Sequence, residues 1–223
     1  MAPTGNPVLP RPRPGRIALQ GRYARLEPLS STHAEALYEA SSGEGAAARF
    51  AYLGEQPPAD RAALRSWIET ASTTEDPLFF AVIDRANGRA AGRQALMRMV
   101  PEHGVIEIGH ILWGPAIART RIASEALYLA ARYAFDDLGY RRFEWKCNNL
   151  NAPSKKAALR FGFALEGVFR QHMWVKGANR DTAWFAMLDR DWPRLRREYD
   201  RWLDPANFDA QGIQRSALNV SQA

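Results

Sequence analysis

The turn at residues 114–121, Gly-Pro-Ala-Ile-Ala-Arg-Thr-Arg, is the clearest place in the sequence for chemistry. It follows a segment with the pattern of a strand and opens directly into an almost wholly apolar helix that starts near Ile122. The first N–H groups of a helix have no partner within the helix and lie at the positive end of its dipole, so such a turn suits a phosphate-bearing ligand. Most strand-to-helix turns bind nothing, so the neighbouring segments decide whether this one is a site.

The neighbouring segments have the patterns that would position the turn. Residues 105–113 read as a strand, and residues 122–138 as a helix so apolar that it should lie deep against a sheet. Residues 141–147 alternate polar with apolar side chains, which is the period of a half-buried strand. Asn151 is then a good N-cap, and Pro153 fits the first turn of the helix that follows.

That helix is predicted to end at Gly162, with Leu159 and Phe161 facing the core. The remaining elements are hairpins at 78–84/90–100 (around Asn87-Gly88) and 164–175/181–188, and helices at 30–40, 59–70 and 191–202. Residues 41–58 read as irregular. The sum is a single α/β (α+β) domain, with a mixed, mainly antiparallel sheet of about six or seven strands flanked by helices.

The order of these motifs resembles the Gcn5-related N-acetyltransferase (GNAT) superfamily, and within it the branch of ribosomal-protein acetyltransferases related to RimJ and RimL. The resemblance is carried by Glu107-Ile108-Gly109-His110, Ile122-Ala123-Ser124-Glu125-Ala126-Leu127, Asn151-x-x-Ser154, Leu159-Arg160-Phe161-Gly162-Phe163 and Glu166-Gly167. It implies a GNAT-like domain that transfers an acetyl group from acetyl-CoA directly to a primary amine, in a ternary complex and without a metal. The acceptor would be a protein N-terminus or a small molecule.

The resemblance also implies catalytic roles for Glu107 and Ser154. An ammonium cannot attack a thioester, so the acceptor must lose a proton first, and Glu107 is the candidate base. A surface carboxylate, or one paired with an arginine, is the competing interpretation of Glu107. His110 has suitable chemistry, but in a regular strand it points to the opposite face from Glu107. Ser154 would stabilise the departing CoA thiolate, and Asn151 would contact the pantetheine or hold the helix start.

The cofactor-binding residues that the resemblance implies are Leu112, Trp113, Ala118, Arg119, Thr120, Arg121, Ile122, Ala123, Ser124, Asn151 and Ser154. The family's phosphate loop usually has glycine where this chain has Arg121, and only Ala123 fits its pattern. Glycine permits positive φ and a close approach of phosphate to the backbone. Two interpretations follow: the arginines themselves bind phosphates by charge-assisted hydrogen bonds, or acyl-CoA binding has been weakened or lost. An oxyanion donor is expected from the strand backbone, at a bulge around residues 111–113.

Composition agrees with a compact enzyme. The chain has 223 residues, 46% of them hydrophobic, and a net charge of +6. Nothing in it reads as a signal peptide or a membrane span, and with a single cysteine, Cys147, a cytoplasmic location is the default expectation. Cys147 reads as a small buried residue, and no histidine spacing suggests a metal site.

Domain boundaries follow from the same patterns. Residues 1–20 form a basic, proline-rich stretch that we expect to be a flexible arm, residues 21–203 the transferase domain, and residues 204–223 a tail. The tail could reach a second subunit, which leaves a homodimer open. The resemblance implies an acceptor pocket in variable segments such as 41–58, so the sequence does not identify the acceptor.

Three hypotheses follow. The leading one is an acetyl-CoA-dependent N-acetyltransferase. The alternative, motivated by Arg119 and Arg121, is a GNAT-fold acyl-CoA-binding or regulatory protein with weak or no transferase activity. A nucleic-acid-associated protein is the third, but the chain has no recognised nucleic-acid motif.

Overall fold

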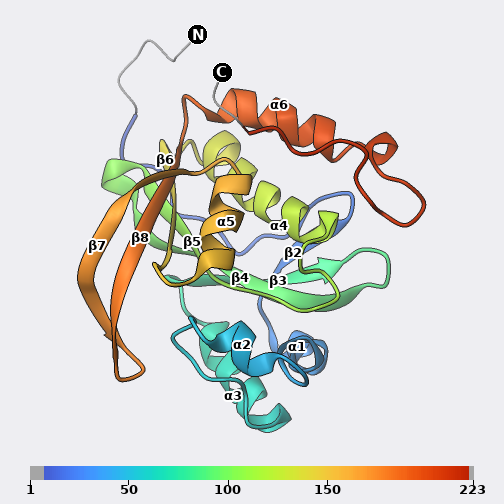
Figure 1. Ribbon diagram of the computed structural model, residues 1–223, viewed down its shortest axis with the longest axis vertical. Helices are drawn as coiled ribbons and strands as arrows, with labels where there is room; N and C mark the ends of the chain where they lie inside the picture. Colours follow the sequence, from blue (N-terminus) through green and yellow to red (C-terminus); the bar gives the residue numbers. More distant parts are fainter. Residues whose placement is uncertain (1–7, 221–223) are drawn as a thin grey trace. The chain divides into compact units, whose positions relative to one another are not determined.

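The computed structural model describes residues 8–220 and is shown in Figure 1. These residues fall into two compact units. The N-terminal unit consists of residues 14–98 and 108–130, and the C-terminal unit of residues 8–13, 99–107 and 131–220.

The described residues form one sheet of eight strands. In the order in which they lie in the sheet, the strands are β1 (Leu19–Gln20), β2 (Ala24–Pro28), β3 (Leu78–Asp84), β4 (Arg89–Val100), β5 (Val105–Trp113), β6 (Arg142–Asn148), β8 (Ala178–Leu188) and β7 (Ala164–Val175). Strands β4 and β5 contribute residues to both units. The predicted α/β class with a mainly antiparallel sheet is confirmed, but the predicted number of six or seven strands is wrong. The two strands that the sequence patterns did not indicate are β1, which has two residues inside the proline-rich segment, and β2.

The six α-helices of the described residues are α1 (Ala34–Ser41), α2 (Ala46–Phe50), α3 (Arg61–Ala71), α4 (Arg121–Arg132), α5 (Ala152–Arg160) and α6 (Trp192–Trp202). Short α2 lies in the segment 41–58 that was expected to be irregular. A π-helical turn, Tyr133–Asp137, continues α4 and is followed by Gly139, whose φ is +69°. The predicted helix over residues 122–138 is therefore an α-helix and a π-turn in succession.

The core of the N-terminal unit lies between β3, β4 and the helices α1 and α3. The buried side chains include Leu37 from α1, Leu64 and Ile68 from α3, and Phe79 from β3. Their spacing along α3, which Asp60 caps by accepting a hydrogen bond from the Ala63 N–H, is that of one helix face. This packing fixes the strands that carry the candidate site residues of this unit.

Two glycines allow β4 and its neighbours to approach closely in the N-terminal unit. A Cβ at Gly92 would lie 2.7 Å from the carbonyl oxygen of Leu112, and one at Gly114 would lie 2.8 Å from the carbonyl oxygen of Ala91. Neither contact leaves room for a side chain. The start of the turn that follows β5 is thus held against β4, and the Gly114 N–H donates to the Ala91 carbonyl.

The C-terminal unit pairs β6 with β8 and β8 with β7, both antiparallel. Figure 1 shows β7 and β8 as a long curved hairpin. In α5, Ala158 is fully buried and Phe161, directly after the helix, is nearly so, but Leu159 is 51% exposed. The prediction that Leu159 faces the core is wrong, because Ala158 takes the inward position and the next residue is turned about 100° around the helix. Gly162 has φ +91°, as a helix stop requires.

The segment 1–20 lies partly outside the described residues, which begin at residue 8. Its described part makes contacts in both units: Leu19 and Gln20 pair with β2, and the Arg11 N–H donates to the Pro101 carbonyl. No helix among residues 8–220 is long and apolar enough to cross a membrane.

Candidate active site

The turn between β5 and α4 is closed by its own hydrogen bonds. Thr120 caps the helix: its Oγ1 accepts from the Ile122 N–H at 3.2 Å and donates to the Ile117 carbonyl at 2.7 Å. Its carbonyl accepts from the N–H and the hydroxyl of Ser124. The sequence predicted unpaired N–H groups at this helix start. The Ile122 N–H is not unpaired, because it donates a hydrogen bond to the Thr120 side chain. Thr120 was predicted only as a ligand contact, and its capping role is one that threonine commonly has.

The two arginines of the turn differ in conformation. Arg119 is exposed and has φ +64°, the left-handed conformation for which a phosphate loop commonly uses glycine. Arg121, which stands where the family has its inner glycine, is instead the first residue of α4, and its guanidinium lies over the Tyr23 ring at 4.3 Å. The unusual backbone therefore occurs two residues before the position that the comparison of motifs indicated.

The helix start is supported by buried polar groups of the same unit. Glu125, next to the predicted contacts Ala123 and Ser124, is buried and accepts hydrogen bonds from the N–H groups of Arg22, Tyr23 and Ala24 at 2.5–2.8 Å. Ala123 and Ser124 are themselves only 2% exposed, so a ligand could meet little more than their backbone.

Buried Gln94 links β4 with the end of β5 and with α4. It accepts a hydrogen bond from Trp113 Nε1 at 3.3 Å and donates to the Ala126 carbonyl at 2.9 Å. Leu112, the other predicted contact on this strand, is 4% exposed. Gln94 thus fixes Trp113, a predicted binding residue of β5, to α4 within the N-terminal unit.

Strand β5 is locally irregular at His110, which has φ +49°. A bulge was expected around residues 111–113, and the left-handed residue directly precedes them. Left-handed φ in a non-glycine residue costs of order 1–3 kcal/mol, so the surrounding contacts must hold it. The parity argument that set Glu107 and His110 on opposite faces assumed a regular strand, which the chain does not have here.

Arg93, on β4, is the side chain that holds His110. It is 3% exposed, donates from Nη1 to the His110 carbonyl at 3.1 Å, and forms an ion pair through Nη2 with Glu55, which precedes α3. Its guanidinium also lies over the Trp67 ring at 4.4 Å. Burial alone would raise the pKa of Glu55, but the charge of Arg93, with hydrogen bonds from the Glu55 backbone and from Arg93, lowers it. Sequence reasoning missed Arg93 and Glu55, and neither carries a motif that would have indicated them.

Glu107, the predicted base, lies in the C-terminal unit and is ion-paired with a lysine. Lys146 Nζ lies 2.9 Å from Glu107 and 2.7 Å from Glu144, and the three side chains are only 4–9% exposed. Lys146 Nζ also lies 3.9 Å from the centre of the Trp184 ring. Arg142 extends the network, since its Nε lies 2.6 Å from Glu144. The alternation of charges at 142, 144 and 146 on one face of β6 was a signal in the sequence that went unused.

Ser154 and Asn151 lie together at the start of α5, also in the C-terminal unit. Asn151 Oδ1 accepts from the Ser154 N–H at 3.1 Å, which confirms Asn151 as the N-cap. Ser154 Oγ accepts from Trp145 Nε1 at 3.0 Å, so the hydroxyl has a fixed orientation. Burial raises the pKa of the Cys147 thiol, more than a hydrogen bond with Ser154 and the nearby positive charges lower it. Cys147 is a buried free thiol, and the prediction of a small buried residue at this position is confirmed.

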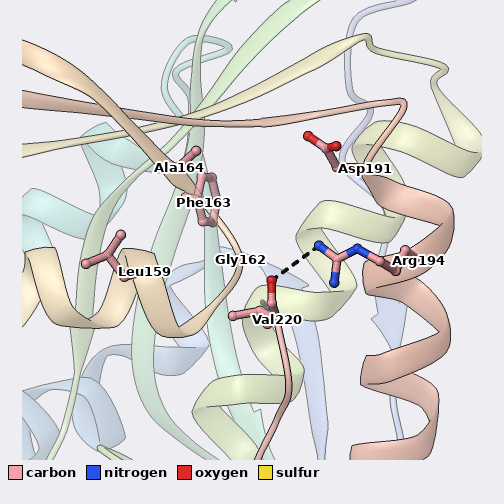
Figure 2. Close-up of a pocket in the computed structure, with 7 residues that line it drawn as sticks. All are labelled: Leu159, Gly162, Phe163, Ala164, Asp191, Arg194 and Val220. Atoms are coloured by element: carbon pink, nitrogen blue, oxygen red, sulfur yellow. Dashed lines mark hydrogen bonds between the residues drawn. The ribbon is translucent and has the colours of Figure 1, made fainter. Parts of the chain in front are cut away.

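A small pocket occurs elsewhere in the C-terminal unit, between the end of α5 and the start of α6 (Figure 2). It has a volume of about 150 Å³, and the Arg194 guanidinium at its wall donates to the Val220 carbonyl at 3.2 Å. Its lining includes none of the predicted site residues. Ligand pockets are usually of several hundred Å³, so we assign this one no role.

Comparison with known proteins places the chain in a family. The acetyltransferase (GNAT) domain family matches residues 24–164, which is more than half of the chain. A solved structure of a GCN5-related N-acetyltransferase from Brucella melitensis is 57% identical, covers 95% of this chain and 96% of its own, and has a TM-score of 0.93. A GNAT-family acetyltransferase from Chromobacterium violaceum is 38% identical over 86% and 98% of the two chains, with a TM-score of 0.77.

A curated relative, the uncharacterized N-acetyltransferase p20 of Bacillus licheniformis, is 30% identical over 117 residues, which are 51% of this chain and 63% of the relative. The chain thus spans less than two thirds of that relative. The chain belongs to the GNAT acetyltransferase family, and the predicted class of enzyme, an N-acetyltransferase, is confirmed at the level of that family.

Proposed function

We propose that the chain is an acetyl-CoA-dependent N-acetyltransferase that moves an acetyl group directly to a primary amine, of a protein N-terminus or a small molecule, in a ternary complex. The observation that carries the proposal is the family match over residues 24–164, because it includes every predicted site residue from Glu107 to Ser154. We also propose, from the sequence alone, that the chain is related to RimJ and RimL, that it is cytoplasmic and that it can form a homodimer.

For the donor, we propose that the turn before α4 binds the CoA phosphates. Support comes from the positive end of the α4 dipole and from the exposed guanidinium of Arg119 beside it. Arg121, stacked on Tyr23, would hold the start of the helix rather than bind a phosphate. On this assignment Arg119 alone supplies the charge that binds the phosphates.

For the chemistry, the acceptor ammonium loses one proton, the amine nitrogen attacks the thioester carbonyl carbon, and the C–S bond breaks as the C–N bond is kept. Backbone N–H groups of residues 111–113, after the irregular His110, are the proposed donors to the oxyanion. The amine's second proton goes to the departing thiolate. Ser154, oriented by Trp145, is proposed to stabilise that thiolate.

The ion pair with Lys146 changes what can be proposed for Glu107. The Glu107 carboxylate is only 4% exposed and already pairs with the buried ammonium of Lys146, so a substrate amine has little access to it. We therefore assign Glu107, with Lys146, the role of fixing β5 against β6.

An acyl-CoA-binding or regulatory protein without transferase activity is the second candidate. It is favoured by Arg121 at the family's glycine position, where the side chain is used to stack on Tyr23. Binding of acetyl-CoA without transfer is what would distinguish it.

The test combines binding and turnover. Acetyl-CoA at about 100 times its Kd should stabilise the folded chain by about 2.7 kcal/mol, which at 2–4 °C per kcal/mol corresponds to a rise in Tm of about 5–11 °C. Free thiol should then appear with an amine from a panel of N-terminal peptides, polyamines and amino acids. Absence of both effects at millimolar acetyl-CoA would exclude the proposed function, and stabilisation without thiol release from any amine would support the second candidate. Ser154→Ala is expected to slow thiol release while acetyl-CoA still raises Tm.

A further inference from the structure

His110 stands out among the histidines of residues 8–220 because the fold holds it in a costly conformation. Its φ of +49° lies in the left-handed region, where a side chain with a Cβ is disfavoured, yet its side chain is 30% exposed. Arg93, which is itself buried, donates a hydrogen bond to the carbonyl of this residue. A buried arginine that secures one strained residue indicates that the orientation of that residue matters.

The surroundings of the His110 ring are those of a group that exchanges protons. One side lies against Phe79, with ring centres 5.1 Å apart. Nδ1 lies 3.9 Å from Glu55 Oε2, which is within range of an ion pair but longer than a hydrogen bond. Glu55 is in turn fixed by Arg93, and its side chain is 24% exposed. His110 therefore has an apolar wall, a nearby carboxylate and access to solvent, all within the N-terminal unit.

We propose that His110 is the catalytic residue that takes the proton from the acceptor amine, and that Glu55 is the positioning residue that stabilises the resulting imidazolium. This deepens the proposed function and rests on it. With Nδ1 toward Glu55, Nε2 receives the proton of the R–NH3⁺ acceptor. The imidazolium then gives this proton to water, so each turnover releases one proton to solvent along with the amide and CoA thiol.

The charges around His110 favour a neutral ring before the reaction. Burial lowers its pKa below the ordinary value of about 6.5. The charge of Glu55 opposes this effect, and the charges of Arg93 and Arg98 add to it. Among the described residues of its unit these are the charged groups that act on the ring. An imidazole that is neutral at pH 7 and has a carboxylate at 3.9 Å can accept a proton and hold the resulting charge.

The direct test replaces the ring without releasing the backbone. Asparagine and glycine both tolerate left-handed φ, so His110→Asn and His110→Gly keep the strand conformation. We expect kcat/KM for the best amine of the panel to fall by about 10²–10⁴-fold in both, with the rise in Tm caused by acetyl-CoA unchanged. Added imidazole should restore part of the activity of His110→Gly. The matched control is His103→Asn, at an exposed histidine, which should keep wild-type kinetics.

The pH profile separates a catalytic role from a structural one. Wild-type kcat/KM should fall on the acid side as His110 is protonated, and this acid limb should be absent from His110→Asn. In Glu55→Gln the limb should move to lower pH, because the charge that raises the pKa of His110 is lost, and NMR titration of the His110 ring should show the same direction without any substrate.

Three outcomes are informative. A His110→Asn protein with wild-type kcat/KM and an unchanged acid limb would overturn the inference while leaving the proposed function intact. Loss of activity that imidazole does not restore, together with an unchanged limb in Glu55→Gln, would also overturn it. Failure of the unaltered protein to acetylate any amine would instead overturn the proposed function, and this inference with it.

Discussion

Strand β5 carries two charged clusters whose members on the strand are only three residues apart in sequence. Glu107 belongs to the first cluster, with Lys146, Glu144 and Arg142, in the C-terminal unit. His110 belongs to the second, with Glu55 and Arg93, in the N-terminal unit. The sequence favoured Glu107 over His110 as the proton acceptor, whereas we propose His110 for that role.

The two clusters differ in whether every charged side chain is buried and paired. We call a cluster closed where this holds and open where one member is accessible and incompletely paired. In the first cluster, Lys146 lies within 3 Å of both carboxylates and all three side chains are nearly inaccessible, so a substrate has little access to any of them. In the second, the pair of Arg93 and Glu55 is closed but His110 stands 3.9 Å from it and remains accessible. A saturated buried ion network stabilises one arrangement of strands, whereas an incompletely paired, accessible group at its edge is available for chemistry.

Removing Lys146 should have the largest effect on stability. Lys146→Met leaves the buried Glu107 and Glu144 without their shared cation, and breaking a buried pair in this way costs about 3–5 kcal/mol. At 2–4 °C per kcal/mol for a chain of this length, Tm should fall by about 6–20 °C. Thermal unfolding followed by circular dichroism measures this. Lys156→Met, at an exposed position of α5, is the matched control and should change Tm by no more than about 1–2 °C. A Lys146→Met protein as stable as the control would show that the cluster is not closed.

Glu125 tests whether a carboxylate is structural because it is buried and fully hydrogen-bonded, and not because of the unit in which it lies. It lies in the same unit as His110 but is buried and saturated by three backbone N–H groups. Glu125→Gln keeps the shape but replaces one acceptor oxygen with an amide that cannot accept, so the free energy of unfolding should fall by about 2–3 kcal/mol. Urea titration gives this value. Glu69→Gln, at an exposed carboxylate on α3, serves as the control, and equal values for the two variants would contradict the assignment.

The comparison also shows which features the sequence could predict. Residues 105–113 were predicted as a strand and form β5, and the hairpin around Asn87-Gly88 is present, because alternation and turn residues act locally. Leu159 was misplaced since hydrophobicity does not tell which of two adjacent helix residues faces the core. Strand β1 has no local sequence signal, because its two residues form a strand only by pairing with β2.

The candidate site was less predictable for a physical reason. The partners of His110 come from residues 55 and 93, one of them in a segment without any pattern, and only folding brings them together. The left-handed backbone at His110 and Arg119 is likewise invisible, because non-glycine residues in that conformation are held by tertiary contacts. By contrast, the N-cap at Asn151 was predictable because a helix cap is a local interaction.

Replacing Glu107 tests the proton-transfer role directly. In Glu107→Gln the amide oxygen can still accept from Lys146, and Lys146 keeps Glu144 as its counter-ion, so we expect a loss of about 1 kcal/mol in the free energy of unfolding. If Glu107 is structural, kcat/KM should fall by less than about tenfold, and its acid limb should stay where it is in the unaltered protein. Steady-state kinetics from pH 5 to 9 decide the matter. Disappearance of the limb in this variant would restore Glu107 as the base and remove the distinction between the clusters.

The smallest expected effect is on the pH dependence of the free energy of unfolding. It comes from His110, in the second cluster. Burial lowers the pKa of His110 in the folded chain below its unfolded value of about 6.5. Above that value neither state binds the proton, so His110 contributes no pH dependence. As pH falls below it, the unfolded chain binds a proton that the folded chain does not, and the free energy of unfolding declines until pH passes the folded pKa. Urea titrations between pH 5 and 8 should show a shallower acid decline for His110→Asn than for the unaltered protein, whereas His103→Asn, at an exposed position, should follow the unaltered curve. Parallel curves for His110→Asn and the unaltered protein would mean that the His110 ring is protonated as readily in the folded chain as in the unfolded one, and the neutral imidazole on which the proton transfer depends would have lost its physical basis.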